Sequence, residues 1–317
     1  MKTATVFGGG GFIGNHLVSD LKERGYFVVA VDMKHPKFNH SLADVFVLGD
    51  LRNENVVKAY MTVDEVYQLA ADMGGAGYVF VKDNDLQIML NSAQINLNTA
   101  KNAYRAGKVF FSSSACIYPE HNQKDTINPN TAENTAYPAN PDSEYGWEKL
   151  FAERLYAVAA KALMPATVRI ARFHNVYGPL GTYSGGREKA PAAICRKVAM
   201  AENGGCVQIW GDGNQTRSFM YITDCLKGIR MIMDSDYDVP INLGSSEIVS
   251  INDMAKMVIE IAGKDLTLNH VKGPEGVRGR TSDNSLIKSL FGWEPNVALE
   301  CGLSKTYLWI WEQVVGK

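Results

Sequence analysis

The sequence predicts an α/β fold, with a doubly wound parallel sheet in its first half and a smaller mixed α/β domain after it. In the first half, short strand-like runs alternate with helical patterns, which is typical of βαβ units and a parallel sheet. Beyond residue 177 the chain becomes rich in Gly, Pro and Ser and its pattern becomes less regular, which indicates a change of domain. We expect a first domain over residues 1–174, with a return segment near 216–243, and a second domain over 175–215 and 244–317.

Each expected element follows from the period of its apolar residues. Runs of β-branched and aromatic residues predict strands at residues 3–7, 27–31, 45–48, 65–69, 109–112, 167–173, 208–210 and 240–243. Apolar residues at helical spacing predict helices at residues 15–24, 86–106, 145–161, 190–201, 222–233, 251–262 and 299–314. The last helix carries the apolar cluster Tyr307–Trp311, which we interpret as a face that packs on the core or on a partner.

Composition and charge exclude several classes of protein. The chain has 317 residues, a formal net charge of −2 and 46% hydrophobic residues, which is typical of a globular protein and not of a nucleic-acid binder. No apolar run approaches the roughly 20 residues of a membrane-spanning helix. A strand-like run directly follows Met1 and Lys2, so we expect no secretion signal and a cytoplasmic location. The five cysteines are odd in number and lack C-x-x-C spacing, so we expect reduced thiols, no disulfide framework and no metal site.

A glycine-rich loop follows the first expected strand and opens a helix. Gly8, Gly11 and Gly14 recur at every third position, as is needed where a chain turns sharply and its backbone approaches a pyrophosphate at a helix N-terminus. Asp32 ends the second strand roughly 20 residues later, where a carboxylate accepts hydrogen bonds from both ribose hydroxyls. Because that carboxylate repels a 2′-phosphate, we expect a Rossmann-type domain that binds NAD and not NADP, with Asp50 near the adenine.

Tyr145 and Lys149 lie one turn apart on the same face of an expected helix. A tyrosine must lose its proton to oxidise an alcohol, and a neighbouring ammonium favours the phenolate and lowers the pKa of the phenol. Ser114 lies just after the strand at 109–112, where its hydroxyl can hydrogen-bond the reacting oxygen. Together these residues indicate a hydride-transfer site, although the Tyr145 and Lys149 spacing by itself also fits an ordinary helix face.

Cys116 and Lys189 are candidate acid–base groups. Oxidation of a sugar at C4 acidifies the hydrogens on C3 and C5, and inversion of such a carbon requires proton transfer on both faces of the ring. A thiol becomes a competent base once a nearby cation favours the thiolate. Lys189 lies between a loop and a helix that has Pro191 in its first turn. The alternatives are a cysteine that only packs and a lysine that binds phosphate or lies on the surface.

In combination, the glycine loop, Ser114 and the Tyr145–Lys149 spacing resemble the short-chain dehydrogenase/reductase superfamily. The long C-terminal half resembles its extended branch, whose members remodel nucleotide sugars. Longer segments resemble the GDP-mannose 3,5-epimerase family, and they lie at residues 70–75, 113–119, 172–179, 185–192, 210–219 and 273–280. The resemblance covers almost the whole chain and is weak at 34–44 and 120–136, which we expect to be loops.

The resemblance implies a homodimer, built on helices of the first domain, that inverts C3 and C5 of GDP-mannose through a 4-keto intermediate with bound NAD. The products would be GDP-L-galactose and GDP-L-gulose. The implied catalytic residues are Tyr145, Lys149, Ser114, Cys116 and Lys189. The expected cofactor contacts are Gly8, Gly11, Phe12, Ile13, Gly14, Asp32, Asp50, Leu51, Ala70, Tyr145 and Lys149. The implied substrate contacts are Gly75, Ser114, Cys116, Asn175, Glu188, Lys189, Ala190, Lys197, Gln215, Arg217 and Arg278.

Three of the implied substrate contacts, Lys197, Arg217 and Arg278, are cations in a nearly neutral chain and suit a diphosphate. Routine surface pairing is the alternative for each of them.

Two other functions stay open at this point. A 4,6-dehydratase or a 4-epimerase would share the hydride-transfer residues, but a dehydratase is expected to carry a carboxylate where this chain has Cys116. A non-catalytic NAD-sensing protein would keep the glycine loop and would not need Ser114, Tyr145 and Lys149.

Overall fold

The computed structural model describes residues 1–163 and 167–316. Its centre is a seven-stranded sheet with the strand order β11-β6-β5-β4-β1-β2-β3, in which every neighbouring pair is parallel. The strands are β1 (Thr3–Phe7), β2 (Phe27–Asp32), β3 (Val45–Leu48), β4 (Glu65–Gln68), β5 (Lys108–Ser114), β6 (Thr167–Phe173) and β11 (Ile241–Leu243). The order confirms the predicted doubly wound fold, and its direction reverses between β1 and β4.

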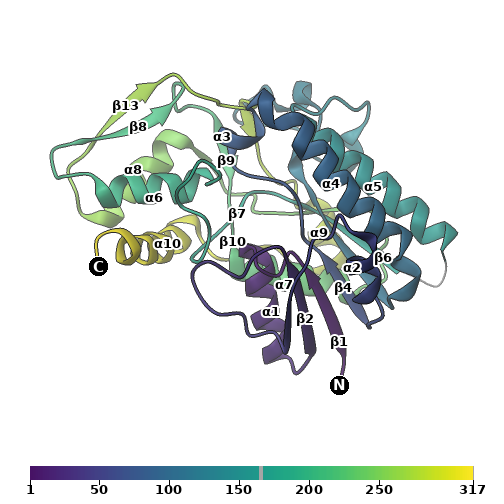
Figure 1. The fold of residues 1–317 in the computed structure, drawn as a ribbon. Coiled ribbons are helices and arrows are strands. Elements are labelled where there is room, and N and C mark those ends of the chain that lie inside the picture. The colour runs from purple at the N-terminus through teal and green to yellow at the C-terminus, as the bar shows by residue number, and fades with distance from the viewer. Residues whose placement is uncertain (164–166, 317) are drawn as a thin grey trace.

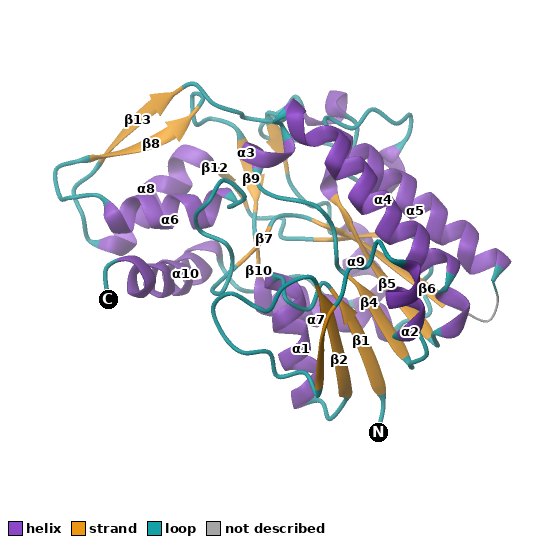
Figure 2. Ribbon diagram, viewed as in Figure 1, coloured by secondary structure: helices purple, strands orange, loops and turns teal. Residues whose placement is uncertain are grey.

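Helices cover both faces of this sheet (Figure 1). One face carries α1 (Phe12–Glu23) and α7 (Ile222–Asp234), and the other carries α2 (Glu54–Ala59), α4 (Asp85–Lys101) and α5 (Glu144–Ala162). The strands alternate accordingly: Phe110 packs in the core on the α1 side, and Phe111 packs in the core on the α5 side, because successive side chains of a strand point to opposite faces. Figure 2 shows α4 and α5 running side by side.

The second part of the chain packs α6 (Ala190–Met200), α8 (Ile251–Ala262) and α10 (Leu299–Val314) against one another, in the lobe at the left of Figure 1. Its short strands are β7 (Val176–Tyr177), β8 (Cys206–Trp210), β9 (Thr216–Ser218), β10 (Met220–Tyr221), β12 (Ile248–Ser250), β13 (Thr267–Val271) and β14 (Gly279–Arg280). They form the pairs β10-β7 and β13-β8 and the sheet β12-β9-β14. The remaining short helices are α3 (Ala76–Val79) and α9 (Ser285–Phe291), with 3-10 turns at Lys82–Asn84, Ala103–Arg105, Ala115–Ile117, Glu120–Gln123 and Glu133–Ala136.

One apolar core connects the two parts of the molecule. Leu17 of α1, Ile229 of α7 and Ile310 of α10 belong to the same cluster of buried side chains. Within the expected return segment, β9 pairs with β12 and β14, and the chain rejoins the large sheet only with α7 and β11. The second part therefore shares the apolar core on the face of the sheet that carries α1 and α7.

The structure differs from the sequence prediction at element ends and in several elements that the sequence analysis did not expect, among them α2, α9 and β13. The helix predicted at 86–106 ends at Lys101, because the Asn102 side chain bonds back to the carbonyl of Asn98 (2.9 Å) and the chain turns toward β5. The strands β7, β10 and β14 contain only two residues each, which is too short for a periodic signal.

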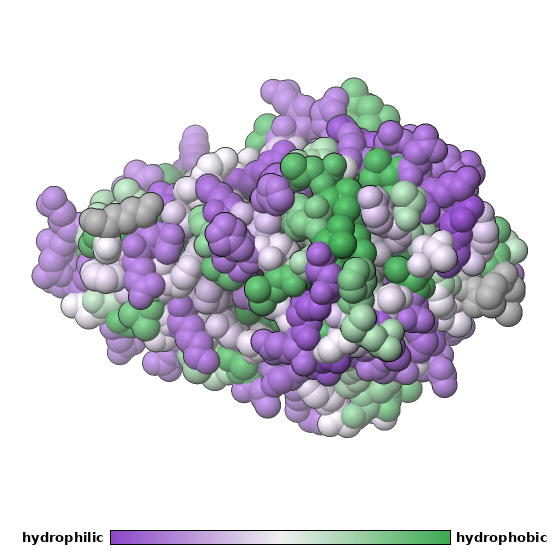
Figure 3. All heavy atoms as spheres, turned by 60° about the horizontal axis from the view of Figure 1, so that its bottom comes forward, coloured by the Kyte–Doolittle hydropathy of each residue, from purple (hydrophilic) through white to green (hydrophobic). Residues whose placement is uncertain are grey.

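Among the described residues, no helix is long and apolar enough to cross a membrane. On the face in Figure 3, hydrophilic and hydrophobic side chains are interspersed, with one hydrophobic band near its centre.

A buried ion pair ties β5, β6 and α5 together behind the strand ends. Arg172 of β6 binds both carboxylate oxygens of Glu153 of α5 (3.0 and 2.9 Å), and the side chains of the pair are each 5% exposed. Ser113 of β5 donates to the same carboxylate, and Arg172 also bonds to the hydroxyl of Tyr118 (3.1 Å). Displacement of either residue would leave a buried charge without its counter-charge. The pair therefore keeps β6 and α5 in fixed positions relative to each other.

Replacement of one partner tests this tie. We expect Arg172→Met to lower the free energy of unfolding by about 3–5 kcal/mol, because the Glu153 carboxylate would stay buried without its counter-charge. The double variant Glu153→Met/Arg172→Met is expected to recover much of the loss. Urea unfolding followed by circular dichroism measures both, and a single variant within about 1 kcal/mol of the parent chain would contradict the assignment.

Candidate active site

The glycine loop joins β1 to α1 at the carboxyl edge of the sheet, where the strand order reverses. A Cβ on Gly14 would lie 2.1 Å from the carbonyl oxygen of Gly8, so the first turn of α1 packs directly on the loop. Gly11 is the N-cap residue, and none of the described side chains caps the helix there. The N–H groups of Phe12, Ile13 and Gly14 have no partner within the helix. They form a site suited to an anion such as a pyrophosphate.

The carboxylate of Asp32, at the end of β2, lies beside the glycine loop. One oxygen accepts a hydrogen bond from the N–H of Gly10 (3.0 Å), and the other accepts from the N–H of Lys34 (3.2 Å). Burial raises the pKa of Asp32, and the two N–H groups oppose this shift by stabilising the charged form. Each oxygen keeps a free lone pair, as contacts with two ribose hydroxyls require.

The other expected cofactor residues are positioned by different kinds of contact. Asp50 forms an ion pair with Arg52 (2.6 Å), whose hydrogen bonds keep the pKa of Asp50 below its usual range. Leu51 is buried in the core on the α5 side of the sheet. Ala70 follows β4, and the buried side chain of Gln68 bonds to both its carbonyl (2.9 Å) and its N–H (3.2 Å). Gln68, which the sequence analysis did not single out, thereby fixes the loop next to the glycine loop.

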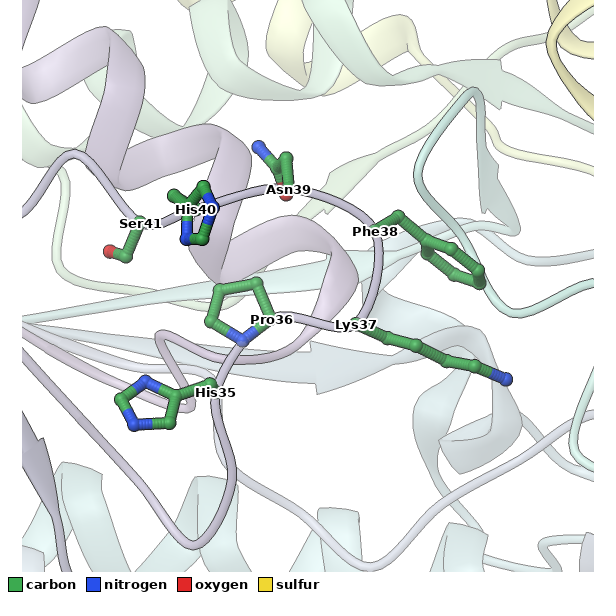
Figure 4. A pocket seen from close by; sticks show the side chains of 7 residues that line it. All are labelled: His35, Pro36, Lys37, Phe38, Asn39, His40 and Ser41. Atoms are coloured by element: carbon green, nitrogen blue, oxygen red, sulfur yellow. The ribbon is translucent and has the colours of Figure 1, made fainter.

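The loop after β2 forms a pocket lined by residues 35–41 (Figure 4). Asn39 of this loop accepts a hydrogen bond from Asn15 of α1 (2.7 Å). The Phe38 ring stacks on Tyr183, with 5.5 Å between the ring centres. The loop therefore connects α1 with the segment that leads to α6, and it includes none of the residues expected to react.

Tyr145 and Lys149 lie in the first turns of α5 and are 7% and 1% exposed. The Lys149 ammonium is 5.8 Å from the centre of the Tyr145 ring and donates to the carbonyl of Ser112 (2.9 Å). The Ser114 hydroxyl, at the end of β5, accepts from the N–H of Cys116 (3.2 Å) and lies within hydrogen-bonding reach of Tyr145. The structure thus brings the three expected hydride-transfer residues together.

Burial dominates the electrostatics of this group. It raises the pKa of Tyr145, the charges of Cys116 and Glu148 add to the rise, and the hydrogen bond with Ser114 opposes it. Burial also lowers the pKa of Lys149. The sequence argument expected Lys149 to lower the pKa of the phenol, whereas in the structure burial raises it and Lys149 does not offset the rise. A further positive charge in the cleft would favour the phenolate.

Cys116 and Lys189 come from distant parts of the chain, and Cys116 lies beside the phenol while Lys189 is close enough to Cys116 to feel its charge. Cys116 is partly buried and packs with Tyr145 in a small apolar cluster. Lys189 is the N-cap residue of α6. Burial lowers the pKa of its ammonium, while the nearby Cys116 and Cys225 raise it. The two candidate acid–base groups are therefore electrostatically coupled to each other.

A contact between the loop after β4 and the segment before α6 brings Lys189 to the edge of the sheet. A Cβ on Gly75 would lie 2.1 Å from the carbonyl oxygen of Glu188, so the two backbones pack without room for a side chain. The N–H of Gly75 donates to the carbonyl of Arg187 (3.0 Å), and the Arg187 guanidinium bonds to Asp72 (2.9 Å). The sequence analysis assigned no role to Asp72 and Arg187. The signal that could have indicated this ion pair is the opposite charge of the two residues.

The residues on either side of Lys189 are the expected substrate contacts Glu188 and Ala190. Glu188 accepts from the N–H of Gly186 (2.6 Å) and forms an ion pair with Arg196 (3.6 Å). Ala190 is the first residue of α6.

Three further expected substrate residues gather around β8 and β9. Lys197 and Gln215 bond to carbonyl groups of β8, at 2.7 and 3.1 Å, and Asn175 bonds to a carbonyl of β9 at 3.0 Å. The side-chain oxygen of Gln215 is buried and has no partner within the described residues, so it can accept a hydrogen bond from a bound molecule.

Arg217 and Arg278 differ in whether a carboxylate neutralises their charge. Arg217 donates to the carbonyls of Thr216 (2.7 Å) and Glu275 (3.0 Å), and burial lowers its pKa to about 10. Arg278 forms an ion pair with Asp212 (3.0 Å). Arg217 is therefore available to a phosphate, whereas Arg278 would have to exchange a partner to bind one.

The sequence analysis missed one residue that contacts the expected site directly. Arg280 of β14 donates a hydrogen bond to the sulfur of Cys116 (3.1 Å). Nowhere in residues 1–163 and 167–316 do three His, Cys, Asp or Glu side chains gather as metal ligands would.

Comparisons with known proteins show the family and the relatives of this chain. A sequence model described as the NAD dependent epimerase/dehydratase family matches residues 4–244. The chain is 47% identical to GDP-mannose 3,5-epimerase of Arabidopsis thaliana, over 98% of this chain and 82% of that protein. It is similar to the structure of UDP-glucose 4-epimerase from Thermotoga maritima with UDP-glucose (TM-score 0.85, 25% identity, 98% and 99% of the two chains). It is also similar to a mutant UDP-glucuronic acid 4-epimerase from Bacillus cereus in complex with UDP-4-deoxy-4-fluoro-glucuronic acid and NAD (TM-score 0.83, 26% identity, 98% and 99%).

The packing of the glycine loop gives a prediction that opposes helix propensity. Alanine is favoured over glycine inside a helix by about 1 kcal/mol, yet we expect Gly14→Ala to lower the free energy of unfolding by about 1–3 kcal/mol, because the new Cβ would overlap the Gly8 carbonyl. We also expect the variant to lose bound NAD during gel filtration. Chemical unfolding and the nucleotide content of the purified protein measure the two effects. A stabilised variant that retains NAD would contradict the proposed packing.

Proposed function

The chain belongs to the NAD dependent epimerase/dehydratase family, and we propose that it is a nucleotide-sugar epimerase that inverts C3 and C5 of GDP-mannose with bound NAD. The observation that supports the proposal is the packing of the Cys116 thiol beside the buried phenol of Tyr145, with the amine of Lys189 within electrostatic range of that thiol. A 4-epimerase acts at C4 alone, whereas inversion of the carbons next to C4 needs two further proton-transfer groups. The similarity to a protein named GDP-mannose 3,5-epimerase supports the same conclusion.

The cofactor fits the residues around the glycine loop. We assign the pyrophosphate to the uncapped first turn of α1 and the adenosine ribose to Asp32, whose negative charge would repel the 2′-phosphate of NADP. The proposed contacts are Gly8, Gly11, Phe12, Ile13, Gly14, Asp32, Asp50, Leu51, Ala70, Tyr145 and Lys149. When bound, NAD⁺ supplies a hydride acceptor for C4 and the positive charge that the cleft requires.

The phenolate of Tyr145 takes the proton of the C4 hydroxyl as C4 is oxidised. Ser114 donates a hydrogen bond to the oxygen that becomes the ketone, which holds it next to the phenol. The ammonium of Lys149, fixed on the carbonyl of Ser112, stabilises the phenolate that this step requires.

The C4 ketone then permits inversion of its neighbours, since the charge of a carbanion at C3 or C5 spreads onto the ketone oxygen. Cys116 and Lys189 exchange protons with these carbons from opposite faces of the ring. Because burial lowers the pKa of Lys189, its ammonium gives up a proton more readily at neutral pH than that of an exposed lysine. Return of hydride to C4 leaves no net oxidation.

The GDP-sugar is held by residues of both parts of the chain. We assign its diphosphate to the cations of the second domain, above all to Arg217, whose hydrogen bonds within the described residues go to carbonyl groups. The proposed substrate contacts are Gly75, Ser114, Cys116, Asn175, Glu188, Lys189, Ala190, Lys197, Gln215, Arg217 and Arg278.

Isotope exchange tests the reaction. With GDP-mannose in D₂O we expect NMR spectra to show deuterium at C3 and C5, because carbons that lose a proton regain one from solvent. Cys116→Ser is expected to slow the exchange by about 10²–10⁴-fold and to keep its bound NAD. A 4-epimerase would give no exchange at either carbon, and a non-catalytic NAD-binding protein would in addition fail to reduce its NAD in a single turnover. Exchange at the parent rate in the variant would remove Cys116 from the mechanism.

We further propose that the protein is a cytoplasmic homodimer. Exposed apolar side chains run along the neighbouring helices α4 and α5, where they lie at Leu86, Leu90, Leu97, Trp147, Phe151 and Val158. An exposed apolar surface of this kind marks an interaction site, and a two-fold axis between two copies would cover it on both. The five cysteines are free thiols, which is typical of a reducing compartment.

Charged substitutions on α5 test the dimer. We expect Phe151→Glu/Val158→Glu to reduce the mass measured by light scattering from about twice 34.8 kDa to that of one chain, because the carboxylates would be buried without partners. Val239→Glu, at an exposed apolar residue outside these helices, is the matched control and should leave the mass unchanged. A parent chain that is already monomeric would contradict the proposal.

A further inference from the structure

Arg280 is a buried cation for which the proposed reaction has no role so far. It is 6% exposed, and three of its nitrogens have partners. Nε donates to the side-chain oxygen of Gln123, Nη2 donates to Asp142 (3.0 Å), and Nη1 donates to the sulfur of Cys116 (3.1 Å). A guanidinium has no acceptor, so the sulfur accepts in this contact. Charge-assisted bonds of this kind favour the negatively charged form of the acceptor.

The partners of Arg280 fix its direction. Asp142 precedes Ser143, the N-cap residue of α5, and its side chain is 6% exposed. Gln123 is fully buried and donates to the carbonyl of Tyr118 (2.9 Å). The two anchors occupy Nε and Nη2 and leave Nη1 directed at the sulfur. The ion pair with Asp142 would be sufficient to connect β14 to the segment before α5. The contact between Nη1 and the Cys116 sulfur is additional to that ion pair.

The titratable and charged groups that face Cys116 come from every element packed around it. They are Tyr145 and Lys149 of α5, Lys189 before α6, Arg217 of β9, Arg280 of β14 and, behind Arg280, Asp142. Cations outnumber carboxylates in this set. Among the described residues, Arg280 alone donates a side-chain hydrogen bond to the sulfur.

We propose that Arg280 is a positioning residue of the epimerisation, which holds the Cys116 sulfur as a thiolate and directs it at the carbon next to C4. The inference rests on the proposed function. In the step that it serves, the C5–H bond breaks, the proton passes to sulfur to form a thiol, and the electron pair enters an enolate whose charge lies on the C4 oxygen. Lys189 then gives a proton to C5 from the opposite face and becomes a neutral amine. An ordinary thiol is mostly protonated at neutral pH, so Arg280 increases the fraction of chains that can react.

Alkylation of Cys116 by iodoacetamide tests the contact without any substrate. The rate is measured by peptide mass spectrometry between about pH 6 and pH 10, with the exposed Cys206 and Cys301 as references in the same sample. In the parent protein the midpoint of the Cys116 profile should lie below those of both references. In Arg280→Met it should rise by about one pH unit or more, and Arg280→Lys should restore part of the shift because it keeps the charge.

Two further measurements separate the possible outcomes. Arg24→Met, which removes an arginine from an ion pair with Asp20 on α1, should leave the Cys116 midpoint unchanged. Deuterium exchange at C5 of GDP-mannose should fall by about tenfold or more in Arg280→Met while the bound NAD stays. A parent midpoint at or above those of Cys206 and Cys301, or an unchanged midpoint in Arg280→Met, would overturn the proposal, and the first result needs no variant to fold. Absence of exchange in the parent protein would instead overturn the proposed function.

Discussion

The parallel register of the seven-stranded sheet is the constraint on which the rest of the site depends. Because all neighbouring strands run in the same direction, the carboxyl ends of β1, β2, β4 and β5 meet at one edge. The glycine loop, Asp32, the Gln68-bound loop and Ser114 therefore lie next to one another although they are far apart in the chain. The strand order reverses between β1 and β4, and there Gly14 packs on the backbone of Gly8 with no room for a side chain.

Desolvation sets the chemistry of this edge. Lys149, Lys189 and Arg217 are cations whose pKa burial lowers, and Tyr145 is a phenol whose pKa burial raises. Burial disfavours the charged form of each group, so each responds strongly to a charge placed next to it. An anionic sugar nucleotide and a positively charged nicotinamide are the charges that this arrangement is suited to receive.

The second part of the chain brings Lys189 and Arg280 toward this edge of the sheet. A shared apolar core joins it to the sheet, and the packing of Gly75 on Glu188, together with the Asp72–Arg187 pair, fixes the segment that carries Lys189. From another direction, Arg280 reaches the turn that carries Cys116. The segment that carries Lys189 and the guanidinium that contacts Cys116 are therefore placed by two separate contacts between the two parts of the chain.

The sequence by itself determined what depends on neighbouring residues. Strand and helix patterns, the glycine loop with Asp32, and the spacing of Tyr145 and Lys149 are local features, so periodicity and turn chemistry predicted them together with the doubly wound fold. The end of α4 at Lys101, the two-residue strands and the role of Gln68 depended on how the chain turns and packs, for which no periodic signal exists. Only the tertiary structure decided that burial raises the pKa of Tyr145, and only it brought Arg280 to Cys116 across 164 residues. The pKa of Tyr145 and the contact of Arg280 both depend on which distant parts of the chain pack around a group and exclude water from it. That packing is a property of the whole folded chain and not of any single segment.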